Sequence, residues 1–178
     1  VPAAGITRPT AIGYERALEG LFVIRALPQW GRNRLASLTK APKRLFADAG
    51  LMAAAARLAP AQILRSGDHL GRTLETFVAA QLAAEAAGAF RDMTLAHVRT
   101  AGGRHEVDLV LDLGDGRVVA VEVKATSSPA PADARHLAWL RDAIGDDFVH
   151  GVVLHTGAAS FPLGDRITAL PICALWAP

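Results

Sequence analysis

Two neighbouring segments within residues 106–124 alternate regularly between apolar and charged side chains, and this pattern constrains the fold more than any other feature of the chain. The odd positions are aliphatic: Val107, Leu109, Leu111, Leu113, Val119, Val121 and Val123. The even positions include the charged residues Glu106, Asp108, Asp112, Glu122 and Lys124. Because successive side chains of a β-strand point to opposite faces, the pattern predicts a hairpin with one apolar face and one charged face.

The turn between the two predicted strands decides which residues stand opposite each other. If the loop is residues 114–116, paired residue numbers sum to 230, so Asp108 stands opposite Glu122. Glu106 then stands opposite Lys124. Cross-strand Cβ atoms lie about 4.5–5.5 Å apart, so two carboxylates in these positions repel and destabilise the hairpin. A hard divalent cation, Mg²⁺ or Mn²⁺, would reverse the sign of that interaction, so the pair predicts a metal site.

Two more side chains extend this site to a catalytic set. Glu75 shares one row of a predicted helix with Val78 and Leu82, where a carboxylate needs a polar partner and could reach the metal. The Lys124 ammonium could orient the attacking water or stabilise charge on a phosphoryl group. The predicted catalytic residues are therefore Glu75, Asp108, Glu122 and Lys124, with Glu75, Asp108 and Glu122 as metal ligands. The alternatives are a solvated hairpin face and, for Glu75, a surface position or a buried salt bridge.

The segments around the hairpin predict an α/β fold with a mixed central sheet. Helices are expected at 70–87 and 133–144, and strands at 94–99, 105–113, 117–125, 149–155 and 167–176, the last interrupted by Pro171. Residues 66–178 would form this core. Residues 1–65 would form a helix, a basic hairpin and an Ala-rich helix.

The acidic motif and the order of elements together resemble the PD-(D/E)XK nuclease superfamily, which has a restriction-endonuclease-like αβββαβ core. The resemblance rests on Glu75, on Asp108 in the first strand of the hairpin, and on Glu122 and Lys124 in the second. It implies that Asp108 and Glu122 bind Mg²⁺, that Lys124 assists catalysis, and that Glu75 completes the site.

A narrower resemblance covers nearly the whole chain. The segments 41–51, 74–78, 106–108 and 170–176 look like the uncharacterised C-terminal domain that follows an AAA+ ATPase module in many prokaryotic proteins. This resemblance implies an ATPase module in the same polypeptide as a partner. Because the chain also lacks an initiator Met, we expect it to be a fragment of a longer protein.

Charge and composition limit the choice of partners. The formal net charge is only +2, so binding to nucleic acid, expected to be DNA, would need a local basic cluster. The candidate cluster consists of Trp30, Arg32, Arg34, Lys40, Lys43 and Arg44. A solvated hairpin, or a docking face for the ATPase, is the favoured alternative for these residues. The oligomeric state stays open.

The remaining candidates for chemistry predict little. The six histidines show no zinc spacing, so each is expected at the surface or in a hydrogen bond, and only His105 flanks the acidic strand. The single cysteine, Cys173, is expected to be buried in a strand; it excludes an internal disulfide and fits a cytoplasmic protein. Trp139 and Trp176 are expected in the core. Neither a phosphate-binding loop nor a membrane-spanning run is present.

Two functions follow from these patterns. The first is a Mg²⁺-dependent nuclease domain that cleaves nucleic-acid phosphodiester bonds through a metal-activated water. The second is a catalytically silent module of the same fold that mediates nucleic-acid or protein binding for an AAA+ ATPase.

Overall fold

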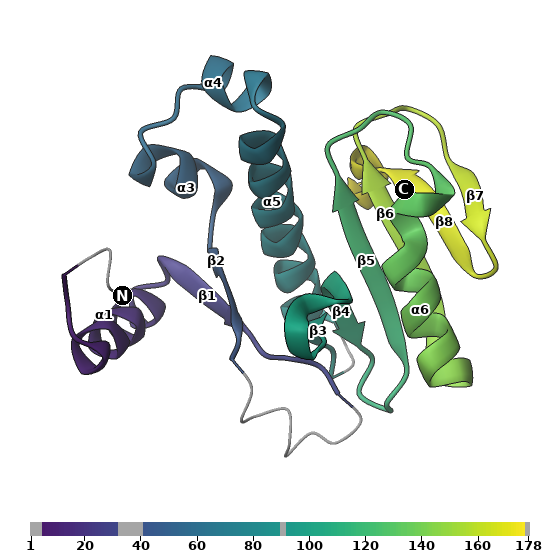
Figure 1. The fold of residues 1–178 in the computed structure, drawn as a ribbon, viewed down its shortest axis with the longest axis horizontal. Coiled ribbons are helices and arrows are strands. Elements are labelled where there is room, and N and C mark those ends of the chain that lie inside the picture. The colour runs from purple at the N-terminus through teal and green to yellow at the C-terminus, as the bar shows by residue number, and fades with distance from the viewer. Residues whose placement is uncertain (1–4, 32–40, 90–91, 177–178) are drawn as a thin grey trace.

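The protein has a mixed α/β fold built on a six-stranded sheet. The computed structural model describes residues 5–31, 41–89 and 92–176 (Figure 1). The strand order in the large sheet is β3-β4-β5-β6-β8-β7, and β1 and β2 form a separate two-stranded sheet. The prediction of an α/β fold with a mixed sheet is therefore confirmed.

Three antiparallel strands form one half of the large sheet. They are β3 (Thr94–Arg99), β4 (Glu106–Asp112) and β5 (Val118–Lys124). Leu109 stands opposite Val121 and Leu111 opposite Val119, so the expected register is confirmed over this part of the hairpin. The ladder ends at Leu109, so Asp108 and Glu106 make no backbone pair with β5.

Parallel pairing builds the other half of the sheet. After β5 the chain passes through α6 (Arg135–Ile144) and returns as β6 (Phe148–His155), which pairs with β5 in parallel. β8 (Ile167–Pro171) pairs with β6 in parallel, and β7 (Phe161–Gly164) closes the edge as an antiparallel strand. β7 was not expected from the sequence, because its four residues include Pro162 and Gly164.

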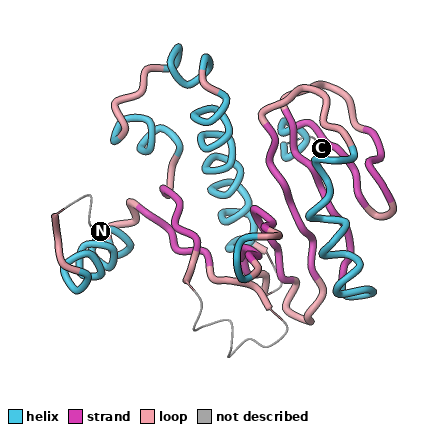
Figure 2. Tube along the Cα trace, in the orientation of Figure 1, coloured by secondary structure: helices cyan, strands magenta, loops and turns pink. Residues whose placement is uncertain are grey.

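A long helix covers one face of the sheet and α6 covers the other (Figures 1 and 2). The long helix is α5 (Gly67–Gly88), which begins where the Ser66 hydroxyl accepts a hydrogen bond from the His69 amide. One buried cluster gathers Val78 and Leu82 of α5 with Leu109 and Val121, and a second gathers residues of α6 with Val110 and Val118. The expectation of a single apolar face on the hairpin is thus wrong, because the sheet lies between two helices.

A β-bulge in β4 interrupts the alternation on which that expectation relied. Ala96 of β3 pairs with Val110, whereas Val98 pairs with Val107, so β4 has one residue more than β3 between the two pairs. As a result, Val107 packs with Val110 in the cluster under α6, whereas Leu109 packs under α5.

The N-terminal third packs against this core (Figure 1). Its elements are α1 (Arg8–Gly20), β1 (Ile24–Leu27), β2 (Lys43–Phe46), α3 (Ala49–Ala55) and α4 (Pro60–Arg65). Leu27 is buried in the same cluster as Val78 of α5, and the Trp30 amide donates a hydrogen bond to the His97 carbonyl of β3. These contacts hold β2 near the end of β4.

Several local expectations are corrected by the structure. The helix expected from residue 133 begins at Arg135, because residues 131–134 form a short 3₁₀ turn in which Asp133 accepts a hydrogen bond from the Ala130 amide. The last strand ends at Pro171 and a 3₁₀ helix (Ile172–Trp176) follows it, because proline lacks the amide that a strand ladder needs. Cys173 in that helix is exposed, so it is not the buried strand thiol that was expected.

The ring side chains also depart from expectation. Trp176 is 51% exposed, so its assignment to the core is wrong, whereas Trp139 packs partly buried against the cluster under α6. His97 and His155 are both buried, and the ring of His155 accepts a hydrogen bond from the Gly157 amide, as was expected for a histidine away from the surface. The helices that the structure describes include none that is long and apolar enough to cross a membrane.

The close packing of α6 on β6 predicts a sharp difference between two glycine substitutions. A Cβ atom at Gly151 would lie 3.0 Å from a Phe148 ring carbon and 3.1 Å from an Ile167 side-chain carbon. We therefore expect Gly151→Ala to lower the free energy of unfolding by about 1–3 kcal/mol. Gly164→Ala on β7 is the matched control, because a Cβ there meets nothing within 4 Å. Urea denaturation of both variants measures the difference, and equal stability would contradict this account of the packing.

Candidate metal and active site

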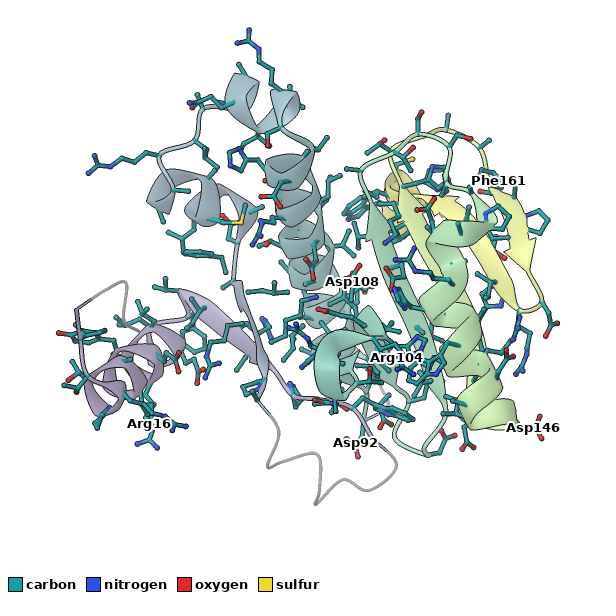
Figure 3. All side chains as sticks on the ribbon, viewed as in Figure 1. Arg16, Asp92, Arg104, Asp108, Asp146 and Phe161 are labelled. Carbon is teal, nitrogen blue, oxygen red and sulfur yellow. The ribbon has the colours of Figure 1, made fainter. Side chains whose placement is uncertain are left out.

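Asp108 lies at the centre of a group of charged side chains where the ends of β4 and β5 separate. The Asp108 Oδ2 atom accepts a hydrogen bond from the Val123 amide at 3.1 Å, so the carboxylate takes a backbone partner beyond the end of the ladder. The other oxygen, Oδ1, lies 3.4 Å from the Lys43 ammonium of β2. Figure 3 labels Asp108 beside α5. This carboxylate therefore links three elements that are far apart in the sequence.

The first group around Asp108 is an acidic cup, which we define as Glu75, Glu106 and Asp108 around the Lys43 ammonium. Lys43 Nζ forms ion pairs with Glu75, with Asp108 at 3.4 Å and with Glu106 at 3.6 Å. Burial alone would lower the pKa of Lys43, but the negative charges of Asp108 and Glu75 outweigh it and the pKa is raised. Lys43 is therefore a neutralised cation and not a free basic side chain.

Glu75 has the polar partner that a carboxylate in its row of the helix requires. Its pKa is raised, first by burial and then by the negative charge of Asp108, while Lys43 acts in the opposite direction. Its partner is a lysine from β2. Glu75 is thus already engaged by a cation supplied by the protein itself.

The second group is the buried pair Glu122 and Lys124 at the end of β5. Their charged atoms lie 2.9 Å apart, and the side chains are 3% and 29% exposed respectively. Burial, followed by the negative charge of Asp108, raises the pKa of Glu122 to about 8. Glu122 Oε1 accepts no hydrogen bond from any residue that the structure describes.

Asp108 and Glu122 meet at the edge between two strands and do not share one face of the sheet. Glu122 lies between Val121 and Val123, which pack under α5, so strand alternation directs Glu122 toward the α6 side. The bulge turns Asp108 toward Lys43 and α5. The charge of Asp108 still raises the pKa of Glu122, so the two carboxyl groups are electrostatically coupled.

The arrangement of these side chains can be compared with the ligands that the predicted divalent cation would need. Among residues 5–31, 41–89 and 92–176, no group of three or more His, Cys, Asp or Glu is arranged to hold a metal ion. The set of Glu75, Asp108 and Glu122 is therefore not assembled as a three-ligand site. Mg²⁺, however, is commonly bound through one or two carboxylates plus water and phosphate oxygens. Asp108 and Glu122 are two electrostatically coupled carboxyl groups, so they fit that smaller requirement.

An open groove leads to the acidic cup. It has a volume of about 510 Å³, and Asp108, Glu75 and Glu106 line it together with Arg72 and Arg99. Arg99 lies 3.6 Å from Glu106. Arg72 pairs at 3.1 Å with Asp68, which also lines the groove, and Glu122 is not among the lining residues.

The structure separates the residues of the predicted nucleic-acid cluster. Arg32, Arg34 and Lys40 lie outside the described residues. Arg44 pairs with Glu15 at 2.7 Å, and the Trp30 indole donates a hydrogen bond to Asp112 at 3.1 Å. These partners, together with the position of Lys43 in the acidic cup, place the described members of the cluster in contacts within the protein.

Sequence reasoning missed the roles of Lys43 and Glu106. The expected pairing of Glu106 with Lys124 is wrong, because the ladder ends before these residues and each has another partner. A signal for Glu106 existed, since it lies two positions from Asp108 on the same strand. No local signal could identify Lys43, because 65 residues separate it from Asp108.

Three rings lie near Lys124 on the α6 side. His105 stacks on Trp139 with ring centroids 4.3 Å apart, and His136 meets the edge of His105 at 5.7 Å. Burial, then the positive charge of Arg135, lowers the pKa of His136, and Lys124 adds to this effect. The rings of His105, His136 and Trp139 thus border Lys124 with half-buried side chains.

Comparison with known proteins identifies relatives of unknown function. A family model described as a domain of unknown function, DUF4143, matches residues 70–175, and another, DUF8612, matches residues 2–62. An uncharacterized protein of Mycobacterium tuberculosis and one of Mycobacterium bovis are each 30% identical over 167 residues, which are 93% of this chain and 35% of the relative. The chain thus spans about a third of the length of these relatives. No solved structure matches it.

The raised pKa of Glu122 predicts how stability depends on pH. Between the ordinary value of 4.5 and about 8, the folded protein holds the Glu122 proton more tightly than the unfolded chain does. This contribution to stability is complete below pH 4.5 and is lost as the pH rises through 8. Glu122→Gln removes the effect, so the variant should lose less stability than the parent over this range, by on the order of a few kcal/mol.

Urea denaturation at several pH values measures this difference. Glu85→Gln on the exposed side of α5 is the control and should follow the parent protein. If Glu122→Gln and the parent show the same pH dependence, the buried carboxyl does not hold a proton in the folded protein.

Proposed function

The chain belongs to the DUF4143 family, and we propose that it is a restriction-endonuclease-like domain that hydrolyses phosphodiester bonds of nucleic acid with the help of Mg²⁺ or Mn²⁺. The observation that carries the proposal is the meeting of Asp108 and Glu122 beside Lys124 at the separated ends of β4 and β5. Two acidic groups coupled in this way need either a proton or a cation between them. A divalent cation is the choice that also provides hydrolytic chemistry.

The order of elements supports the fold named in the proposal. α5 precedes three antiparallel strands, and α6 connects them to a parallel strand, as in an αβββαβ core. Asp108 lies near the start of β4, and Glu122 and Lys124 lie at the end of β5. In the register of this hairpin both positions belong to the same end of the sheet.

Each side chain has a defined task in this proposal. Asp108 and Glu122 would hold the cation, which when bound lowers the pKa of a coordinated water toward neutrality. Lys124 stays an ammonium group because Glu122 and Asp108 raise its pKa against the effect of burial, and it can donate to a phosphoryl oxygen. Arg72 and Arg99 in the groove would contact flanking phosphates.

The partners of the domain are also part of the proposal. We propose DNA as the nucleic acid, and an AAA+ ATPase module in the same polypeptide, on the resemblance of four segments of the chain to domains that follow such modules. The ATPase would move or open the nucleic acid, and the end of the sheet that carries Asp108 and Glu122 would receive it.

A second candidate function is a silent nuclease-like module that binds a partner without cleaving. The position of Lys43 favours it, because the ammonium already neutralises carboxylates that an active site would offer to a cation. The lack of a three-ligand metal group in the described part of the chain favours it as well.

A cleavage assay distinguishes the two functions. The chain is incubated with Mn²⁺ or Mg²⁺ and with single-stranded and double-stranded DNA and RNA, beside Asp108→Ala, Glu122→Ala and Lys124→Ala. For a nuclease we expect each variant to lose activity by on the order of a hundredfold or more, since each removes charge stabilisation at the reacting phosphate. Asp115→Ala in the exposed turn of the same hairpin should keep full activity. Cleavage that all three site variants retain, or no cleavage by the parent chain, would count against the proposal.

A further inference from the structure

The α6 side of the candidate site presents three aromatic rings and two exposed arginines, which we call the ring surface. The ring surface consists of Arg104, His105, Arg135, His136 and Trp139. We propose that the ring surface binds single-stranded nucleic acid, with the bases on the rings and the phosphates on the arginines. The inference rests on the proposed function for nucleic acid as the substrate and deepens it by naming the strand state. It requires neither cleavage nor a bound metal ion.

The three rings come from two segments and already form a short stack. His105, which precedes β4, lies nearly parallel to Trp139 of α6, with ring centroids 4.3 Å apart and an interplanar angle of 7°. His136, one turn earlier on α6, meets His105 edge-on at 5.7 Å. All three side chains are half-buried, so packing fixes their orientation while part of each stays open to solvent. Rings held in this way suit unpaired bases, because every base has a flat face that can stack.

The two arginines lie next to the rings, and neither forms an ion pair within the described part of the chain. Arg104 directly precedes His105, is exposed and has no partner there, and Figure 3 labels it beside α6. Arg135 directly precedes His136, is exposed, and donates a hydrogen bond to the Ala132 carbonyl at 3.3 Å. Both guanidinium groups therefore keep their positive charge available to a phosphate.

Other arginines near the site are already paired. On the α5 side, Arg72 pairs with Asp68 and Arg99 pairs with Glu106. A carboxylate so close to an arginine offsets much of its attraction for a phosphate. On the α6 side, Asp133 accepts a hydrogen bond from the Ala130 amide and pairs with neither arginine of the ring surface. The described residues thus offer a phosphate more unpaired positive charge on the α6 side.

The ring surface adjoins the end of the sheet that carries the candidate site. Burial and the charge of Arg135 are the main causes that lower the pKa of His136, and the charges of Lys124 and Asp108 also act on it, in opposite directions. The Lys124 side chain is 29% exposed, so it can contact a ligand on the rings. A strand that lies across the rings therefore brings a phosphate to Lys124.

The rings decide between a single strand and a duplex. In a duplex the bases are paired and stacked on one another, so their faces are closed to protein side chains. In a single strand the faces are free, and an aromatic side chain that stacks on a base strengthens binding by about fivefold or more. Arginines alone would attract both forms. The combination of rings and arginines favours the single strand.

Fluorescence anisotropy with labelled oligonucleotides tests the inference, in EDTA so that metal-dependent cleavage does not interfere. The chain should bind oligothymidylate and oligouridylate of about 15 nucleotides at least about tenfold more tightly than a hairpin duplex of the same length. Phosphate contacts from Arg104, Arg135 and Lys124 predict that the logarithm of the binding constant falls against the logarithm of salt concentration with a slope of about −2.

Variants of the rings and of the arginines test the two parts of the surface. His105→Ala should weaken single-strand binding by about fivefold or more, and His105→Phe, which keeps a flat ring, should restore it. His150→Ala is the control, because the His150 ring bonds Thr168 of β8.

Arg104→Gln combined with Arg135→Gln should bring the salt slope closer to zero by about 1.4. Arg16→Gln on α1, which Figure 3 shows on the N-terminal third, should leave the slope unchanged.

Three results would overturn the inference. The first is equal affinity for the single strand and the duplex. The second is single-strand binding that neither His105→Ala nor the double arginine variant changes. The third is equal competition by polyglutamate of matched charge, which has no flat face to stack and would assign the surface to an acidic peptide.

The outcomes separate this inference from the proposed nuclease. Single-strand binding that needs the ring surface, without cleavage when Mn²⁺ is added, supports the inference and rejects the nuclease. Mn²⁺-dependent cleavage by the parent chain, with no effect of the ring-surface variants on binding, supports the nuclease and rejects the inference.

Discussion

The structure around the candidate site depends on the need to compensate four carboxyl groups that lie close together at one end of a sheet. Asp108 interacts with both groups of charged side chains. It accepts a hydrogen bond from the Val123 amide, faces Lys43 and raises the pKa of Glu122. Two lysines from different strands supply the positive charge. A buried carboxylate without such partners is strongly destabilising, so the placement of β2, β4 and β5 relative to one another is tied to these ion pairs.

Much of the fold follows from local patterns. The register of the hairpin up to Leu109 follows from turn length, and the start of α5 follows from the capping chemistry of Ser66. The extra residue in β4 could not be predicted, because a bulge depends on the partner strand and leaves no mark in the alternation itself. The exposure of Cys173 was not predicted either, because Pro171 ends the strand earlier than the apolar run suggests.

The residue types of the site could be predicted better than the contacts that each of these residues makes. Glu122 and Lys124 are two apart on one strand, so their closeness is fixed by strand geometry. Lys43 reaches Glu75 and Asp108 only through the way β2 crosses the end of the core, which no short-range pattern encodes. Whether the carboxylates serve a metal ion or a network of protons depends on that crossing, and the catalytic roles of Glu75, Asp108, Glu122 and Lys124 stay predictions.

The orientation of the acidic motif depends on the bulge in β4. A β4 of the same length that paired with β3 without the bulge would place Val107 opposite Arg99 and turn every residue before Leu109 to the other face of the sheet. Val107 would then point at α5, and the acidic side chain next to it would point at α6 and away from Lys43. Two relatives with the same acidic motif, one with the bulge and one without it, would therefore present it to opposite sides of the sheet.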